Sequence, residues 1–567
     1  MGIRHHGVTL ALAVIAVVIL TTLGIGLLAI GYGVRHHAIA AKADAAAMLA
    51  AEAGYEKAIF WMGRQQDMLS ALQQGTPGTS GSLAFPDSSC SYAISLYTFV
   101  GSRPVFRVVS NGYSGIFERR VDVLTVQMIS GWDMGTCRIP ISATSTDAVN
   151  FMAGETIDLP IHINKASDNP DVKDIFIIGS PAFLQPVAMG EDRYTVGGGD
   201  KYASVMSLFD GGIYFDQPAS RVTDTDSVQS KVTRFRDSTL AQYQFTPTAS
   251  ATSLTSRQPA VQLEFFVEGG VGKVRLTNNC SVRGFRQSSD SRTYDFKIKP
   301  GTGGTQYERY DIYAYHVAPS DADTTGQRFT IPLTNTYVTQ SFGGTTSDPG
   351  GQIFVNGNVV IGGNSTLHNN DQVVKGTVTV VATGNIWVAD SVYVEGSHDA
   401  QGKPTEDNPN VLGLLAQGVI KVVDPGMSDV DGTVSLSGFT YMPVGRPNFP
   451  TASPGTANYF QRYLPDPTTA EAAITVGGGG WGAENVRRDS FGGRKEATGS
   501  QDYLRVHGTI SESMRGVVGV TGFFGTDGYL KSYHMDRRLL TGIVPGDIWL
   551  RGKYVPAPAG WHDYRPN

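Results

Sequence analysis

The sequence predicts a mostly β protein that begins with one long membrane-crossing helix. Three observations lead to this fold class. Residues 8–34 carry no charged side chain, and residues 38–74 continue as an alanine-rich helical pattern. Glycine then punctuates short runs of Val, Thr, Ile and aromatic residues, and makes up 68 of the 567 residues. This usage, about 12% against an ordinary 7% or so, is typical of many short strands joined by tight turns.

Length and charge limit the classes of protein to consider. A chain of 567 residues is too long for one compact domain. The 45 basic and 51 acidic residues nearly balance. Because no long basic run follows the first residues, we expect no nucleic-acid partner. No phosphate-binding loop, CxxC pair or HExxH motif is present, so we expect no cofactor and no zinc site.

Residues 8–34 decide the compartment. As a helix they would extend for about 40 Å, enough to cross a hydrocarbon core of about 30 Å. A cleaved secretory signal has an apolar segment of only about 7–15 residues. Cleavage after Ala40, where small residues would allow it, is therefore the weaker alternative to a retained anchor.

The helical pattern continues beyond the apolar segment. Residues 35–75 contain strong helix formers and no proline. Gly75 and Pro77 then supply a stop signal. We expect one helix of about 65 residues that begins in the membrane and continues into an exported domain, since its outer half has small side chains suited to close packing.

These residues resemble a known family. A short basic leader, residues 1–7, ends at Gly7 and is followed by Val8 and the apolar segment, like the class III signal of type IV pilins. Residues 20–24 (LTTLG) and 51–54 (AEAG) resemble PilX-type minor pilins most. The resemblance implies cleavage between Gly7 and Val8 by prepilin peptidase. It also implies a single-pass inner-membrane protein with a cytoplasmic N-terminus, a periplasmic or extracellular bulk, and other pilin-like subunits as partners.

Three residues of this helix bear on assembly in the resemblance: Thr9, Leu12 and Glu52. Pilins usually carry a glutamate where this chain has Leu12. That carboxylate is thought to neutralise the terminal amine of a neighbouring subunit during assembly. The leucine therefore predicts a minor, tip or assembly component rather than a bulk filament subunit.

A small antiparallel sheet is expected in residues 76–130. Strand-like runs occur at residues 91–99, 104–110 and 119–128, with turn residues at 111–112 and 114–115. A long helix followed by such a meander resembles the plan of a pilin head. Cys90 and Cys137 would be able to form a disulfide if this part is exported.

The remaining sequence is rich in strands. Residues 150–340 predict a β-rich domain, with an irregular insertion at about 205–335 that would form a separate sandwich-like unit. Residues 350–540 contain short runs of β-formers separated by Gly and Asn, which favours a right-handed parallel β-helix. An antiparallel sandwich is the alternative. Residues 541–567 are expected to form a tail.

The end of this region resembles the closing motif of an uncharacterised domain that follows PilX-type N-termini. Residues 504–539 contain the motif's Arg-Gly, Gly-Tyr-x-Lys-x-Tyr and Asp-x-Arg-Leu elements. We expect a last coil with a cap that covers the exposed end of a solenoid. Arg515, Asp536 and Arg538 would then form a buried or half-buried ion-pair cluster.

Residues with catalytic or binding chemistry are few. No pair of carboxylates recurs at a spacing that singles out an acid and a base, so we expect no catalytic residues. Asp429 and Asp431 form a weak calcium candidate without the rest of a calcium loop. The leading interpretation is a non-enzymatic pilus or type II secretion-like component. A surface adhesin that binds glycans through Trp387, Tyr393 and Trp481 is the alternative, and a polysaccharide-active enzyme is the third class.

Overall fold

The computed structural model divides the chain into two compact units. The anchor unit comprises Met1–Tyr97, Val105–Val126 and Tyr554–Asn567, and the large unit comprises Thr98–Pro104 and Gln127–Lys553. The residues that the structure describes are 6–65, 68–100, 103–127, 131–140, 146–165, 175–196, 199–201, 208–217, 232, 243–247, 257–285, 297–298, 307–308, 311–316, 328–332, 340–342, 345–347, 351–362, 372–422, 427–429, 459–461, 468–483, 503–522, 525–541 and 554–566.

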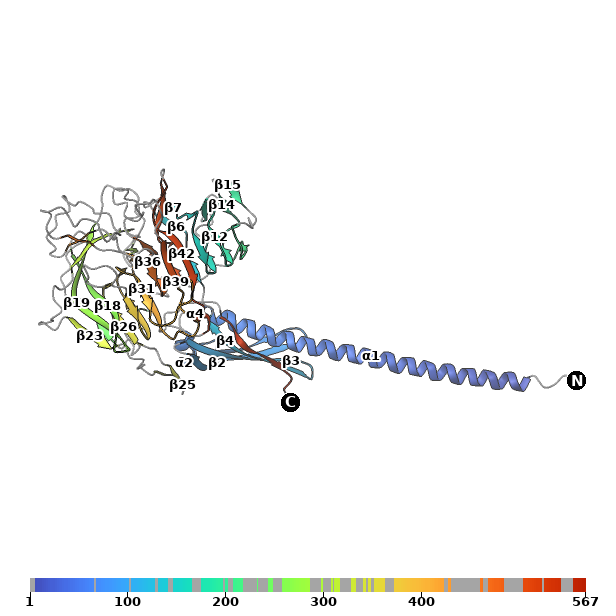
Figure 1. Ribbon diagram of the computed structural model, residues 1–567. Helices are drawn as coiled ribbons and strands as arrows, with labels where there is room; N and C mark the ends of the chain where they lie inside the picture. The colour runs from blue at the N-terminus through green and yellow to red at the C-terminus, as the bar shows by residue number, and fades with distance from the viewer. Residues whose placement is uncertain are drawn as a thin grey trace. The chain divides into compact units, whose positions relative to one another are not determined.

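The anchor unit begins with helix α1, His6–Met62, which contains 57 residues (Figure 1). It ends earlier than the sequence predicted, since the helix was expected to continue through residue 75. After Met62 the backbone tightens, and the amide of Arg64 bonds to the carbonyl of Trp61 at 3.0 Å. A short second helix, α2 (Met68–Gln73), follows. Gly75, at φ +60°, ends that helix as the stop signal predicted.

Five strands form the sheet of the anchor unit, in the order β1-β2-β3-β4-β43. They are β1 (Ser80–Ala84), β2 (Ser89–Val100), β3 (Arg103–Ser114), β4 (Phe117–Gln127) and β43 (Tyr554–Tyr564). The β1–β2 and β3–β4 pairs are antiparallel. Strand β43 was expected to be a tail, but it lies beside β4, so the end of the chain completes the sheet.

Two glycines allow α1 to lie close to this sheet. The sequence placed a turn at residues 111–112, whereas Gly112 lies inside β3 and pairs with Arg119. A Cβ at Gly112 would lie 2.0 Å from the carbonyl oxygen of Ala47, and one at Gly54 would lie 2.2 Å from Ser110 Oγ. The glycines therefore remove the atoms that would separate helix from sheet.

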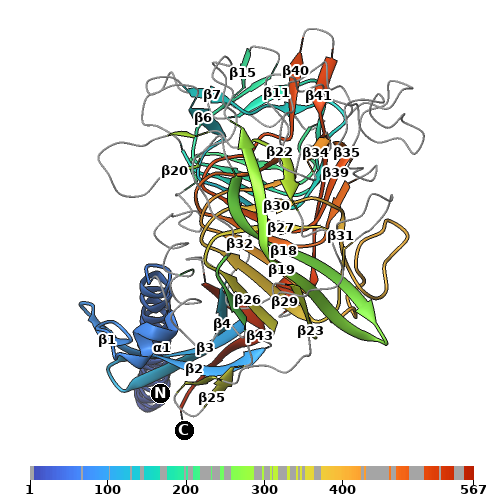
Figure 2. The same ribbon diagram turned by 90° about the vertical axis from the view of Figure 1, so that its left-hand side faces the viewer.

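Three parallel sheets build most of the large unit (Figure 2). The first contains β16 (Ile213–Tyr214), β13 (Val187–Met189), β10 (Ile161–Ile163), β5 (Trp132–Met134), β39 (Tyr503–Glu512), β37 (Ala473–Val476), β32 (Val411–Ala416), β29 (Thr377–Ala382), β26 (Gly351–Val355) and β17 (Tyr243–Phe245). The second contains β28 (Gln372–Val374), β31 (Val392–Val394), β36 (Thr468–Ala470), β39, β42 (Leu530–Met535), β9 (Thr156–Asp158) and β12 (Ala182–Phe183). The third contains β18 (Arg257–Glu268), β27 (Asn358–Ile361), β30 (Ile386–Val388), β33 (Ile420–Val422) and β38 (Trp481–Ala483).

Successive strands from β26 onward enter the first, third and second sheets in rotation. Strand β26 pairs parallel with β29, β27 with β30, and β28 with β31. The antiparallel sandwich considered for this region is therefore wrong. At one corner the side chain of Asn358 accepts a bond from the amide of Asn385, and Asn385 accepts one from the amide of Val419, both at 3.0 Å.

The insertion expected at residues 205–335 is part of the same unit. Strand β18 forms an antiparallel hairpin with β19 (Val271–Phe285), but it also pairs parallel with β27. Its Val261 and Leu263 lie in the core cluster shared with the parallel strands. The separate sandwich that the sequence predicted is therefore wrong. Strands β22 (Asp311–His316) and β23 (Arg328–Pro332) extend the hairpin along β19.

The remaining short elements lie in the large unit. A four-stranded sheet has β15 (Gly199–Lys201), β14 (Tyr194–Val196), β11 (Phe176–Ile178) and β8 (Phe151–Met152). Two-stranded pairs are β6 (Arg138–Pro140) with β7 (Thr146–Ala148), β20 (Lys297–Ile298) with β21 (Tyr307–Glu308), β24 (Gln340–Phe342) with β25 (Thr345–Ser347), β34 (Met427–Asp429) with β35 (Tyr459–Gln461), and β40 (Gly519–Gly522) with β41 (Gly525–Gly528). Helix α4 spans Arg538–Thr541.

The two ends of the large unit meet inside the stack of strands. In the first sheet β5, the first strand of this unit, lies between β39 and β10. In the second sheet β42, its last parallel strand, lies between β39 and β9. The cap predicted for residues 504–539 is therefore wrong, because these strands are flanked on both sides. We call the contact between these first and last strands the seam.

Candidate functional site

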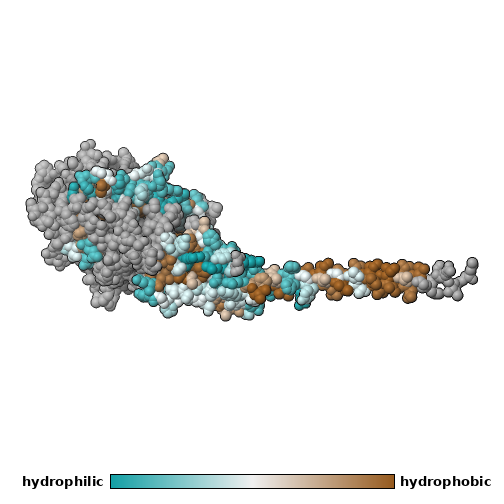
Figure 3. Space-filling view, turned by 90° about the horizontal axis from the view of Figure 1, so that it is seen from below, coloured by the Kyte–Doolittle hydropathy of each residue, from teal (hydrophilic) through white to brown (hydrophobic). Residues whose placement is uncertain are grey.

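The first candidate site is the exposed part of α1. Among the described residues one helix is long and apolar enough to cross a membrane, and it covers Val8–Met62. Side chains from Val8 to Val34 are largely exposed, and Figure 3 shows this length of the helix as mainly hydrophobic surface. Nothing in the described protein covers this apolar surface. Lipid or other apolar helices are the environments that would stabilise it.

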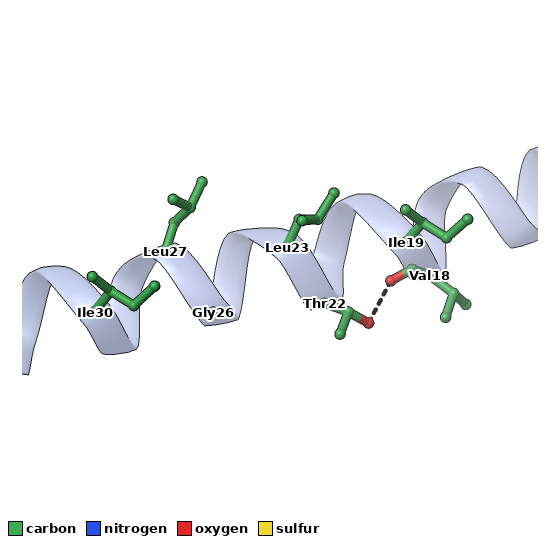
Figure 4. Close-up of a pocket in the computed structure, with 7 residues that line it drawn as sticks. All are labelled: Val18, Ile19, Thr22, Leu23, Gly26, Leu27 and Ile30. Atoms are coloured by element: carbon green, nitrogen blue, oxygen red, sulfur yellow. Dashed lines mark hydrogen bonds between the residues drawn. The ribbon is translucent and has the colours of Figure 1, made fainter.

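One side of this helix has a shallow apolar groove (Figure 4). Its lining residues are Val18, Ile19, Thr22, Leu23, Gly26, Leu27 and Ile30. Thr22 donates its hydroxyl to the carbonyl of Val18 at 2.7 Å, and Thr21 donates to Val17. Both hydroxyls are thus satisfied within the helix, as a membrane interior requires.

The predicted assembly residues lie at different places on α1. The predicted processing residues, Gly7 and Val8, lie in its first turns. Thr9 and Leu12 are exposed. Glu52 is half-buried in the part of the helix that packs on the sheet. Their roles in processing and assembly stay predictions.

The second half of α1 packs on the sheet of the anchor unit. Its buried side chains are Ala47, Ala50, Ala51, Tyr55, Ala58 and Met62. Asp44 lies just before them and binds Arg119 of β4 at 2.6 Å and Arg565 at 2.8 Å. The hydrogen bond from Arg119, followed by that from Arg565, lowers the pKa of Asp44 to about 2. This ion-pair cluster joins the helix, the sheet and the end of the chain.

Two of the three proposed glycan contacts are wrong. Trp387 and Trp481 are 1% exposed, and Trp481 donates its indole N–H to the hydroxyl of Tyr533 at 3.1 Å. Only Tyr393, in β31, is half-buried. The two indoles fill the interior of the large unit, so they offer no stacking surface to a sugar.

The two remaining predicted sites are the calcium candidate and the disulfide. Asp429 lies in β34, but Asp431 falls outside the described residues. Among the described residues no group of three or more His, Cys, Asp or Glu side chains could hold a metal ion. Cys90 and Cys137 are buried in different units and do not form the predicted disulfide. Burial raises the pKa of the Cys90 thiol.

Charged residues are buried at the seam. Glu512 accepts bonds from Trp132 Nε1 at 2.7 Å and from the amide of Trp481 at 2.8 Å. Burial raises the pKa of Glu512 to about 7. Lys531 pairs with Glu155, and burial lowers the pKa of Lys531 to about 8. These side chains come from both ends of the large unit, so they tie its first and last strands together.

The three residues predicted to form an ion-pair cluster are all buried. Asp536 and Arg538 form the pair, at 2.6 Å. Arg515 instead donates to the carbonyls of Val149 and Asn150, at 2.8 and 3.1 Å. Its guanidinium carbon lies 3.6 Å from the centroid of the Phe151 ring. The chemistry of this group is structural, because backbone carbonyls and an aromatic face occupy the cation.

A second polar cluster lies along the second sheet. We call Glu471, His507, His534 and Asp158 the polar row. His507 pairs in register with His534, and His534 with Asp158. Glu471 follows Ala470, which pairs with Val506, so it lies beside His507. With strands about 4.8 Å apart, the Cα atoms of the two carboxylic residues are about 14 Å apart.

Residues outside the row hold its two ends. His398 Nε2 lies 3.0 Å from Glu471 Oε1, and Lys403 Nζ lies 3.0 Å from Asp158 Oδ2. Burial would raise the pKa of Asp158, but hydrogen bonds from Gln185, Lys403 and His534 outweigh it and lower that pKa. No sequence motif indicated this row, because its residues come from strands far apart in the chain.

Comparison with known proteins adds little to this geometry. No protein-family model and no curated protein matches the chain. Among solved structures it is similar to competence-associated pilin ComZ from Thermus thermophilus, with 11% identity, 92% of this chain and 98% of that chain covered, and a TM-score of 0.27.

Proposed function

We propose that this chain is a non-enzymatic, membrane-anchored, pilin-like component of a type IV pilus or type II secretion-like apparatus. One observation carries the proposal. A single helix, α1, is apolar and exposed over its first half and is packed on an antiparallel sheet over its second half. Such a helix can be embedded among lipids or neighbouring helices while its sheet holds a folded head outside.

The finer parts of the proposal follow from the sequence. We propose PilX-type processing between Gly7 and Val8 by prepilin peptidase, an N-terminus on the cytoplasmic side of the inner membrane, and assembly with other pilin-like subunits. Leu12, in place of the assembly glutamate, favours a tip or assembly role. The large unit would be a parallel β-helix of right-handed coil, which the rotation of its strands through three sheets supports.

The alternatives have less support. A glycan-binding surface would need exposed aromatic side chains, and Trp387 and Trp481 are buried. A glycoside-cleaving site would need two carboxyl groups about 5–10 Å apart. The two carboxylic residues of the polar row, Glu471 and Asp158, are each paired with a basic side chain, His398 and Lys403 respectively. This pairing favours a structural role for the row.

Photo-crosslinking in cells would test the proposal. A benzophenone amino acid at Leu23, which is 58% exposed on the apolar part of α1, should give adducts with other pilin-like subunits. The same probe at Tyr97, 53% exposed on the sheet of the anchor unit, is the matched control and should not reproduce those adducts. Adducts with lipid alone at Leu23 would contradict an assembly role and leave a simple anchor.

A further inference from the structure

Residues 395–410 form a loop that contacts the polar row, and we call it the strap. Its tip is a tight hairpin: the amide of Asp399 bonds to the carbonyl of Lys403 at 2.8 Å, and Gly402 has φ +74°. The carboxylate of Asp399 accepts bonds from the amides of Gln401 and Lys403. These bonds from the two amides lower the pKa of Asp399.

Both ends of the strap are held by contacts outside the polar row. At one end the amide of Glu395 bonds to the carbonyl of Val374 at 2.8 Å. At the other end Arg538 donates to the carbonyls of Asn408 and Asn410, each at 2.7 Å. An arginine stays charged at every physiological pH. The ends are therefore held independently of the contacts between the tip and the polar row.

The tip is held by contacts with side chains of the polar row. His398 contacts Glu471, and Lys403 shares Asp158 Oδ2 with His534, whose Nδ1 lies 3.3 Å from that oxygen. The other ring nitrogen of His534 bonds to Ser532 Oγ at 3.1 Å. A neutral His534 thus satisfies both nitrogens while Lys403 supplies the positive charge for Asp158.

Protonation would crowd this arrangement with positive charge. The His534 ring faces three charged or titratable groups: Asp158 from β9, Lys403 from the strap, and His507, whose ring centroid is 5.6 Å away. His507 in turn faces Glu471, at 3.5 Å, and the carboxylate of Asp399. A protonated His534 would add a second positive charge next to Lys403, on the same carboxylate oxygen.

We propose that the strap is an acid-released latch, closed over the polar row at neutral pH and opened at its tip when His534 gains a proton. Opening would expose Glu471 and His507, which are buried in the closed form. The pH change that opens the latch follows from the pKa of His534. Burial, Lys403 and His507 lower this pKa below the ordinary value. A histidine with a lowered pKa in the closed form binds protons better in the open form, so acid favours opening.

Hydrogen–deuterium exchange of the full-length protein in detergent tests this latch. Protection of amides in residues 396–404, corrected for the intrinsic pH dependence of exchange, should fall severalfold between pH 7.5 and pH 5.5. His534→Gln removes the titrating group and should flatten this response. His562→Gln, which changes an exposed histidine on β43 in the other unit, is the matched control and should keep it.

Two outcomes would overturn the proposal. One is equal protection of the strap at both pH values, and the other is a full response that persists in His534→Gln. If that variant does not fold, Lys403→Met decides, because Lys403 is only half-buried and lies on the strap. This substitution should weaken closure at pH 7.5 and shrink the response. All of these measurements are made on the large unit. Their outcome therefore does not affect the proposed role of the membrane helix, which is tested separately.

Discussion

Gly112→Ala gives a quantitative test of how the anchor unit is packed. An added Cβ would lie 2.0 Å from the carbonyl oxygen of Ala47 and 2.5 Å from the amide nitrogen of Ala51. Both atoms belong to the helix backbone and cannot rotate away, so α1 must shift from the sheet. Overpacking of this kind costs about 1–3 kcal/mol, and backbone contacts favour the upper end.

A loss of about 3 kcal/mol should lower the unfolding midpoint of the anchor unit by roughly 10 °C. Scanning calorimetry of the detergent-solubilised protein would measure it, with the transition assigned by exchange of α1 amides. Gly33→Ala, in the same unit, is the matched control, because no atom would lie within 4 Å of its Cβ. An unchanged midpoint in Gly112→Ala would refute the close packing of helix on sheet that we describe.

Three further outcomes follow from the buried and paired groups. Asp44→Asn should destabilise the anchor unit at neutral pH, as measured by denaturant titration. The pKa of Asp44 in the folded protein is about 2, below the ordinary 3.8. The difference in stability between variant and wild type should therefore vanish as pH falls through about 2. The pKa of Glu512 in the folded protein is about 7, above the ordinary 4.5, so the large unit should lose stability as pH rises from about 5 to 8. Glu512→Gln should flatten this dependence of stability on pH. An identical dependence in the variant would contradict burial of the carboxyl. Non-reducing peptide mapping should find no bridge between Cys90 and Cys137, because they are buried in different units, and finding one would contradict this division.

Local sequence signals predicted much of the fold. The apolar residues 8–34 and the alanine-rich segment gave most of α1, because helix propensity and hydropathy act over neighbouring residues. Predicted runs such as residues 376–382 and 412–416 coincide with β29 (Thr377–Ala382) and β32 (Val411–Ala416), since alternate β-formers bounded by glycines are local as well. The Gly-Asn pairs at residues 357–358 and 384–385 mark one corner of the coil.

Long-range order could not be predicted in the same way. The corner bonds span 27 residues between Asn358 and Asn385 but 34 between Asn385 and Val419, so loops of unequal length hide the period. The seam pairs β39 with β5, and Trp132 bonds to Glu512 across 380 residues. Such pairing depends on the whole fold. For the same reason Trp387 and Trp481 were assigned to the surface, although their interior positions follow from strand register.

The mature N-terminus tests the central claim most directly. Intact-mass and N-terminal peptide mass spectrometry would be compared for cells with and without prepilin peptidase. We expect the chain to begin at Val8 when the peptidase is present, with methylation of its amine an additional sign of pilin processing, and to retain Met1 when the peptidase is absent. A chain that keeps Met1 in both strains, or one that begins at Ala41, would contradict a pilin-like origin of the helix.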